Sequence, residues 1–223
     1  YRTRNLGDMI QTVALSRLLA RARGVFRHQL CKAPDDGLVI YNGFLDKERP
    51  PRLEAATAHA QQFLFAGVSG PHFRHREYLR WLSRSPFPIG ARDRATFDFL
   101  QTHGIDTELT ECVTLTLPRY SGPRSGVYSV DYPRGPGRPL THRIPRSLTV
   151  EEQWSVALTE LGLLRTAEAV YTSRLHVALP CLAFGTPVWI ADPTRTFAPS
   201  RFSPVEELGI PYGMLVTADV ATR

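Results

Sequence analysis

The chain has 223 residues, of which 43% are hydrophobic and 22% charged, so it can bury a substantial core as one large domain or two small ones. No apolar run approaches the roughly 20 residues of a membrane-spanning helix, and three widely spaced cysteines fit neither a disulfide framework nor a metal site, which predicts a cytoplasmic protein. The formal charge of +6 comes almost entirely from arginine and favours an anionic ligand. Basic runs and aromatic RNA-binding motifs are lacking, so nucleic acid is not an expected partner. The polar start Tyr1-Arg2-Thr3-Arg4 has neither an initial Met nor a signal-like segment, and we expect the chain to begin inside a longer one.

Strands and helices alternate in the first 117 residues, which predicts a parallel α/β half. A helix begins within Asn5-Leu6-Gly7-Asp8, because apolar residues follow at helical spacing from Ile10 to Leu19. Further along, we expect strands over 37–43, 62–67, 89–91 and 111–117, and helices over 53–61, 73–83 and 94–103. The stretch from Leu117 to Gly126 is rich in Pro, Gly and Ser and predicts a linker, so residues 1–117 and 118–223 are interpreted as two α/β domains.

The second half shows the same alternation. We expect strands over 127–130, 167–172 and 187–190, an irregular loop over 132–145, and helices that begin near 147, at 173 and at 204. The helix near 147 has acids in its first turn, and its apolar positions Val156, Leu158, Leu161 and Leu164 are predicted to pack on the sheet. Long irregular loops in compact domains are often functional, which makes the loop 132–145 a candidate for substrate recognition.

The segment 171–188 carries the strongest functional signal. It indicates a buried strand, a polar turn and an apolar helix, with Ser173 at the N-cap and Gly185 just past the helix end. Arg174 and His176 then fall at the first helical turn, where backbone N–H groups favour an anion and the guanidinium adds a bidentate donor for phosphate or carboxylate. A solvated helix cap is the alternative. Because residues two apart do not share a helical face, the two side chains converge only if Arg174 still lies in the turn.

Two further turns of this kind occur in the first half. In one interpretation, Arg92 and Asp93 form a surface ion pair in which Asp93 caps the following helix; in the other, Arg92 is a second cation that enters a ligand cleft between the halves. Asn5 and Asp8 stand at the start of the first helix, either as caps or, for Asp8, as a general base.

Several familiar catalytic patterns are missing. The histidines form no HxH or HExxH pattern, so no metal is expected. Ser173 has no GxSxG elbow, and the chain has neither a GxGxxG motif nor a Walker loop. His142 lies in the loop 132–145, where plain solvent exposure is the alternative to a functional role.

Three segments, 5–11, 88–93 and 172–188, resemble the polysaccharide pyruvyl transferase family, and the run SRLHVALPCLAFGTPV within the third is the most specific part. Shorter similarities at 112–117, 141–142 and 201–203 support this, and the resemblance covers nearly the whole chain. It implies two Rossmann-like halves similar to the GT-B glycosyltransferase fold, with the ligand in an interdomain cleft. It also implies phosphoenolpyruvate as donor substrate without a further cofactor, and a pair of sugar hydroxyls as acceptor, as in exopolysaccharide biosynthesis.

The family's donor-binding residues fall here on Arg92, Arg174, Leu175 and His176. In the mechanism we infer, the two arginines neutralise the donor's phosphate and carboxylate, and His176 either protonates the enol methylene carbon or only hydrogen-bonds the phosphate. Asp8 is the candidate base for the attacking hydroxyl, and a second hydroxyl then displaces phosphate to close a cyclic ketal. The remaining candidate substrate-binding residues are Ser173, His142, Asn5 and Gly7.

More than one class of acceptor fits the sequence. The chain is short for the family, so a small sugar or a lipid-linked sugar fits as well as a polysaccharide, and the loop 132–145 is the candidate for acceptor specificity. Peripheral membrane association is compatible with a lipid-linked acceptor. Two other functions also fit: a GT-B-like glycosyltransferase that uses a nucleotide sugar, with Glu206 or Glu207 binding the ribose, and a non-catalytic homologue that binds an anion or a glycan.

Overall fold

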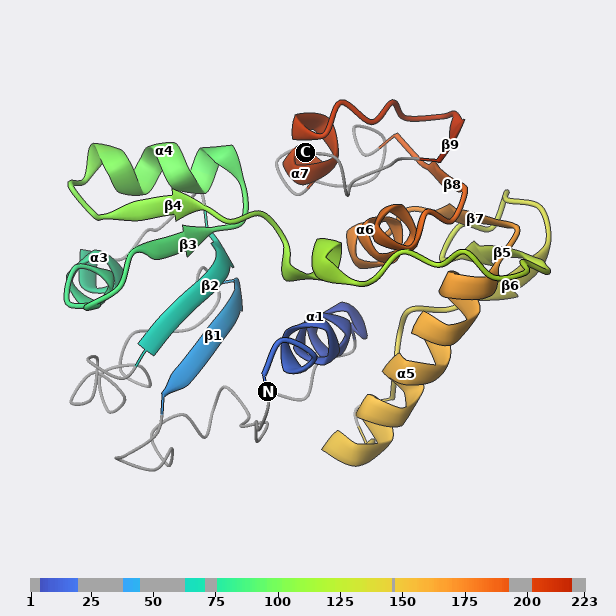
Figure 1. The fold of residues 1–223 in the computed structure, drawn as a ribbon, viewed down its shortest axis with the longest axis horizontal. Coiled ribbons are helices and arrows are strands. Elements are labelled where there is room, and N and C mark those ends of the chain that lie inside the picture. The colour runs from blue at the N-terminus through green and yellow to red at the C-terminus, as the bar shows by residue number, and fades with distance from the viewer. Residues whose placement is uncertain are drawn as a thin grey trace. The chain divides into compact units, whose positions relative to one another are not determined.

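The computed structural model describes residues 5–19, 38–44, 63–70, 76–145, 147–192 and 202–217 (Figure 1). Contacts along the chain divide it into two compact units. The first comprises Tyr1 and residues 22–112, and the second comprises residues 2–21 and 113–223. Each unit has its own sheet and helices, so the predicted α/β class is confirmed. No helix in the described ranges has the length and apolar character needed to cross a membrane.

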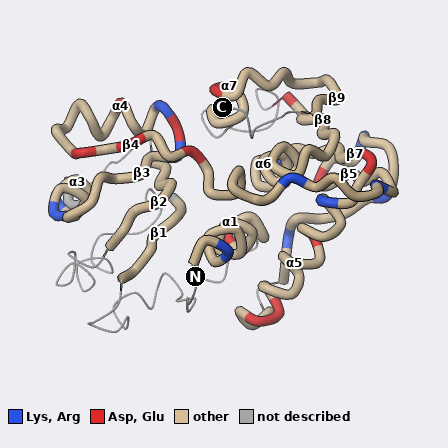
Figure 2. Tube along the Cα trace, viewed as in Figure 1, with Lys and Arg blue, Asp and Glu red and all other residues tan. Residues whose placement is uncertain are grey.

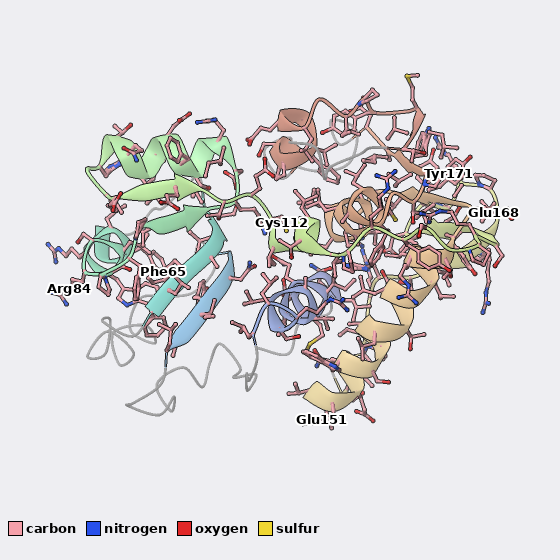
Figure 3. All side chains as sticks on the ribbon, viewed as in Figure 1. Phe65, Arg84, Cys112, Glu151, Glu168 and Tyr171 are labelled. Atoms are coloured by element: carbon pink, nitrogen blue, oxygen red, sulfur yellow. The ribbon has the colours of Figure 1, made fainter. Side chains whose placement is uncertain are left out.

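The first unit is built on a four-stranded parallel sheet in the order β1-β2-β3-β4. Its strands are β1 (Val39–Phe44), β2 (Phe63–Ser69), β3 (Ile89–Ala91) and β4 (Thr107–Leu109), and its helices are α3 (Arg76–Leu82) and α4 (Arg94–Thr102). The core of this unit is aromatic: the Trp81 ring meets the Phe65 ring edge-on at 4.7 Å between centroids and the Phe63 ring at 5.2 Å. Phe65 lies on β2 (Figure 3), and the burial of these rings fixes how α3 packs on the sheet.

The second unit is built on a five-stranded sheet in the order β6-β5-β7-β8-β9, in which only β9 is antiparallel. Its strands are β5 (Val127–Val130), β6 (Arg138–Leu140), β7 (Ala169–Thr172), β8 (Val188–Ile190) and β9 (Leu215–Val216). Its helices are α1 (Gly7–Ser16), the 3₁₀ helix η3 (Val113–Thr116), α5 (Val150–Thr166), α6 (Leu175–Phe184) and α7 (Ser203–Glu207). Helix α1 packs against α5, α6 and η3, so this early helix belongs to the second unit (Figure 1).

This division differs from the predicted boundary at residue 117 in two ways. Helix α1 is part of the second unit because its apolar face packs there, and residues 117–126 are not a linker between the units but part of the second one. The Arg124 guanidinium explains the latter. It donates to the carbonyl oxygens of Arg165 at 2.8 Å and Phe184 at 2.9 Å, and to Thr186 Oγ1 at 2.6 Å, which holds the segment against the ends of α5 and α6.

Two predicted elements are wrong. The strand expected over 111–117 is the short helix η3, because Glu111 turns the chain at a φ of 57° and the following residues bond locally, with Leu117 N donating to Thr114 O. The β-branched alternation there predicts a strand, but packing of η3 on α1 and α6 overrides it. The loop 132–145 contains a strand, β6, and is only partly irregular. The helix expected over 53–61 lies outside the described residues.

Helix α5 starts at a capping box in which Thr149 Oγ1 accepts from Glu152 N and the Glu152 carboxylate accepts from Thr149 N. The acids of this first turn form the red segment at the start of α5 in Figure 2. Leu161 and Leu164 are buried as predicted, whereas Val156 is 38% exposed and Leu158 is 50% exposed. The buried stripe repeats at helical spacing from residue 153, and positions 156 and 158 fall outside it.

Candidate functional site

Three neighbouring strands of the second sheet end in polar residues. Because β6, β5 and β7 are parallel and adjacent, their carboxyl ends lie at the same edge of the sheet. Asp131 follows β5, Thr141 and His142 follow β6, and Ser173 and Arg174 follow β7. The edge of a parallel sheet where strands hand over to helices is the usual ligand-binding position in α/β folds.

An ion pair joins two of these strand ends. Arg174 Nε donates to Asp131 Oδ2 at 2.6 Å, and the side chains are only 20% and 15% exposed. Ser173 does not cap α6 as predicted, because its hydroxyl donates to the Asp131 carbonyl oxygen at 2.8 Å instead. Arg174 itself occupies the N-cap position with an extended backbone. Arg174 therefore lies in the turn before the helix, and we expected its side chain to converge with that of His176 only in this case.

His176 has a backbone that departs from the helix, with φ −81° and ψ 15°. Pro180 explains this, because a proline inside a helix lacks the N–H that would bond the carbonyl four residues earlier, and its ring crowds that carbonyl. The amides of Leu175 and His176 belong to the first turn of α6, where helix geometry offers no carbonyl acceptor and the helix dipole favours an anion. The helix ends as predicted at Gly185, whose φ is 66°.

The start of α1 lies against His176. A Cβ atom at Gly7 would fall 2.6 Å from His176 Nδ1, so only glycine allows this approach. Leu6 N donates to the His142 carbonyl oxygen at 3.0 Å, and Asn5 forms an isolated β-bridge with Arg143. Segment 5–7 is therefore fixed between the end of β6 and the start of α6.

The two polar residues beside Gly7 have distinct roles: Asn5 precedes α1, and Asp8 lies in its first turn. Asn5 Oδ1 accepts from Gly7 N at 3.3 Å, which is a local turn bond, and the N-cap position itself is held by Leu6 and not by Asn5. Asp8 is exposed in the first turn of α1, where a carboxylate also interacts favourably with the helix dipole. Its exposure leaves it accessible to a substrate hydroxyl.

His142 is buried rather than solvent-exposed, with 1% of its surface accessible. Its Nδ1 pairs with Glu160 Oε1 of α5 at 2.7 Å, and its Nε2 is buried without a hydrogen-bond partner among the described residues. A buried histidine–carboxylate pair therefore lies at the end of β6.

The charge of Glu160 also affects Cys181 on α6. Burial is the larger cause, and the negative charge of Glu160 the next, of the raised pKa of the Cys181 thiol.

Arg92 and Asp93 lie in the first unit and are 3% and 2% exposed, so a surface ion pair is excluded. The capping interpretation of Asp93 is confirmed: its Oδ1 accepts from Thr96 N at 2.9 Å and from Thr96 Oγ1 at 2.7 Å. Arg92 N donates to the Val68 carbonyl oxygen at 2.8 Å, which fixes its backbone between β2 and β3.

Sequence reasoning missed Asp131 and Glu160. Asp131 meets Arg174 across 43 positions and Glu160 meets His142 across 18, so no local spacing marks either pair. One sequence feature could have identified Asp131 as a site residue, namely its position directly after a predicted strand. The feature that could have identified Glu160 is weaker: it is an acid among apolar residues at helical spacing.

No protein-family model and no curated protein matches this chain. Among solved structures, the chain is similar to a functionally uncharacterised protein from Klebsiella pneumoniae subsp. pneumoniae NTUH-K2044, with a TM-score of 0.61 and 13% sequence identity. The match covers 97% of this chain and 90% of the Klebsiella protein. At this identity the similarity establishes a shared fold and carries no information about activity.

Proposed function

We propose that the protein transfers a pyruvyl group from phosphoenolpyruvate to two hydroxyls of a sugar or glycan, forming a cyclic ketal and releasing phosphate. One observation carries this proposal. Segments around Gly7, His142 and Arg174, which are far apart in sequence, meet at one edge of the second sheet. These are three of the segments on which the resemblance to polysaccharide pyruvyl transferases rests.

The donor is proposed to bind at the first turn of α6. The amides of Leu175 and His176 and the guanidinium of Arg174 suit a phosphate or carboxylate group, because each adds a donor aimed at an anion. Arg174 is already paired with Asp131 through Nε, so the donor would engage the terminal Nη atoms. The first unit supplies Arg92 as a second cation in this proposal, which assumes a GT-B-like arrangement of the two units.

The proposed chemistry consists of three proton transfers, one addition of a hydroxyl and one displacement of phosphate. His176, as imidazolium, gives a proton to the methylene carbon of phosphoenolpyruvate, and the neighbouring carbon then accepts the oxygen of a sugar hydroxyl. Asp8 takes the proton of that hydroxyl. A second hydroxyl forms the other C–O bond as the C–O bond to phosphate breaks, and its proton leaves with the phosphate, so one phosphate is released for each ketal formed.

The acceptor is proposed to lie along the loop 132–145. Both ends of the loop reach the site, since Asp131 precedes it and His142 belongs to it. The acceptor is a sugar, a lipid-linked sugar or a polysaccharide, and a lipid-linked acceptor would bring the protein to the cytoplasmic face of a membrane. No additional cofactor is part of this proposal.

A thermal-shift titration tests donor binding, with phosphoenolpyruvate, UDP-sugars and GDP-sugars compared on the wild type. Ligand at 100 times its Kd adds about 2.7 kcal/mol to the free energy of unfolding, which is readily measured. We expect stabilisation by phosphoenolpyruvate, its loss in Arg174→Ala, and no loss in Arg84→Ala. Arg84 is an exposed arginine of the first unit (Figure 3) and controls for charge alone.

Other outcomes would overturn the proposal. Stabilisation by a nucleotide sugar alone would indicate a glycosyltransferase, and equal stabilisation of wild type and Arg174→Ala would remove the assigned donor site. Phosphoenolpyruvate binding without phosphate release across a panel of acceptor sugars would indicate a non-catalytic homologue.

A further inference from the structure

Asp131 connects the ends of three strands of the second sheet. Its N donates to the Leu140 carbonyl oxygen at 3.0 Å, and its own carbonyl oxygen accepts from Ser173 Oγ at 2.8 Å. Its carboxylate is used on both sides: Oδ1 accepts from Thr141 Oγ1 at 3.0 Å and Oδ2 accepts from Arg174 Nε at 2.6 Å. Every polar group of this residue is therefore engaged.

The backbone of Asp131 is strained. Its φ is 49°, and within the described residues it shares a positive φ outside glycine only with Glu111. Such a conformation is unfavourable for a residue with a Cβ, and it persists where the surroundings over-determine it. With this backbone conformation at the end of β5, the carboxylate of Asp131 lies beside Arg174.

From this arrangement, and resting on the proposed function, we propose that Asp131 is a positioning residue that orients Arg174 for the donor anion. A carboxylate on Nε fixes the plane of the guanidinium and, with it, the directions in which the Nη N–H groups point. The anion then meets a preformed donor pair instead of a flexible side chain that must first be ordered.

Removing the carboxylate of Asp131 is expected to change the affinity for an anion in opposite directions, depending on whether Asp131 positions Arg174 or acts through its charge alone. A carboxylate 2.6 Å from Arg174 repels a second anion, so a purely electrostatic role means that its removal strengthens anion binding. A positioning role means that removal weakens binding, because Arg174 loses its fixed orientation. A merely structural role lowers stability and leaves the affinity of the folded protein unchanged.

Asp131→Asn separates these three roles. Asparagine tolerates a left-handed backbone and has nearly the same shape, so the variant changes the charge and the bond to Nε but keeps the turn. Isothermal titration of the whole chain with phosphoenolpyruvate is expected to give a Kd about 10- to 100-fold higher than the wild type. An unchanged or lower Kd in the folded variant would overturn the proposal.

A second variant and a second readout keep the test decisive. Thr141→Val removes the bond to Oδ1 and leaves the charge, and we expect a Kd about threefold higher, between wild type and Asp131→Asn. The NMR signal of Arg174 Nε–Hε, assigned through Arg174→Lys, is expected to be dispersed in wild type and averaged in Asp131→Asn; a dispersed signal in both would overturn positioning. If wild type binds no phosphoenolpyruvate, the proposed function fails, and this NMR signal still decides whether Asp131 orients Arg174.

Discussion

The two units place an arginine at similar strand-to-helix turns and then use their acids differently. In the first unit, Asp93 stands next to Arg92 and caps α4 through Thr96, three positions away. In the second unit, Arg174 is paired with Asp131, which comes from another strand 43 positions away. The acid next to its arginine in sequence, Asp93, thus caps the following helix. The acid that pairs with an arginine, Asp131, follows a neighbouring strand of the same sheet.

The contrast extends to the rest of each unit. Both units bury an apolar core, which in the first is aromatic, and the second adds polar contacts over longer separations in sequence, among them those of Arg124 and Thr186. We therefore expect polar substitutions to affect the second unit more than the first.

The largest effect is expected from Arg124→Ala. The guanidinium contacts acceptors on three segments, and its loss leaves carbonyl oxygens at the ends of α5 and α6 without their donor. We expect the second unit to lose about 3 kcal/mol of unfolding free energy in urea denaturation. Arg165→Ala is the matched control, because its side chain stacks on the same Tyr120 ring but is exposed. An equal loss in both variants would contradict the role assigned to Arg124.

A smaller effect is expected from Gly7→Ala, which adds a Cβ at 2.6 Å from His176 Nδ1. The clash is expected to cost about 2 kcal/mol and to displace the imidazole. Gly162→Ala is the control, since a Cβ there meets nothing within 4 Å and the helix gains up to about 1 kcal/mol. Opposite shifts of Tm in the two variants support the close approach of α1 to His176; a matching rise in both would rule it out.

Asp93→Ala is expected to cost about 1 to 2 kcal/mol, and only in the first unit, because it removes the cap of α4. Asp93→Asn keeps an acceptor for Thr96 N and is expected to cost less. Trp81 fluorescence reports on the first unit during denaturation when Trp154 and Trp189 of the second unit are replaced by Phe in every protein compared. Asp93→Asn is expected to leave the affinity for phosphoenolpyruvate unchanged. A fall as large as that expected for Asp131→Asn would contradict the distinction between a capping acid and an acid that orients an arginine.

The smallest effect concerns pH. Burial raises the pKa of the Cys181 thiol, so above about pH 9 this thiol ionises in the unfolded chain before it ionises in the folded one. The unfolded state then binds fewer protons, and the free energy of unfolding falls as pH rises, whereas below that pH the thiol has no such effect. Cys181→Ala is expected to reduce this slope by up to about 1.4 kcal/mol per pH unit in urea titrations between pH 8 and 10. The same slope in both proteins would argue against a protonated buried thiol.

Local patterns were sufficient for much of the fold. The strand before Arg92, the cap at Asp93 and the αL residue at Gly185 follow from the residue itself or its near neighbours. The strand expected over 111–117 failed because the packing of η3 overrode its β-branched pattern.

The candidate site was predicted only in part. Arg174, His176 and Gly7 stand out because helix starts have a local sequence signature. Asp131 and Glu160 do not, since strand order and helix packing bring them to their partners. Pro180 was visible in the sequence, but its effect on the backbone of His176 depends on where the helix begins.

The most direct test of the account is an NMR titration of the ¹⁵N-labelled chain with phosphoenolpyruvate. We expect the largest saturable shifts at the amides of Leu175 and His176 and smaller ones at Gly7, because the account places the donor at the first turn of α6. Shifts concentrated elsewhere in the chain, or none at saturating donor, would contradict it.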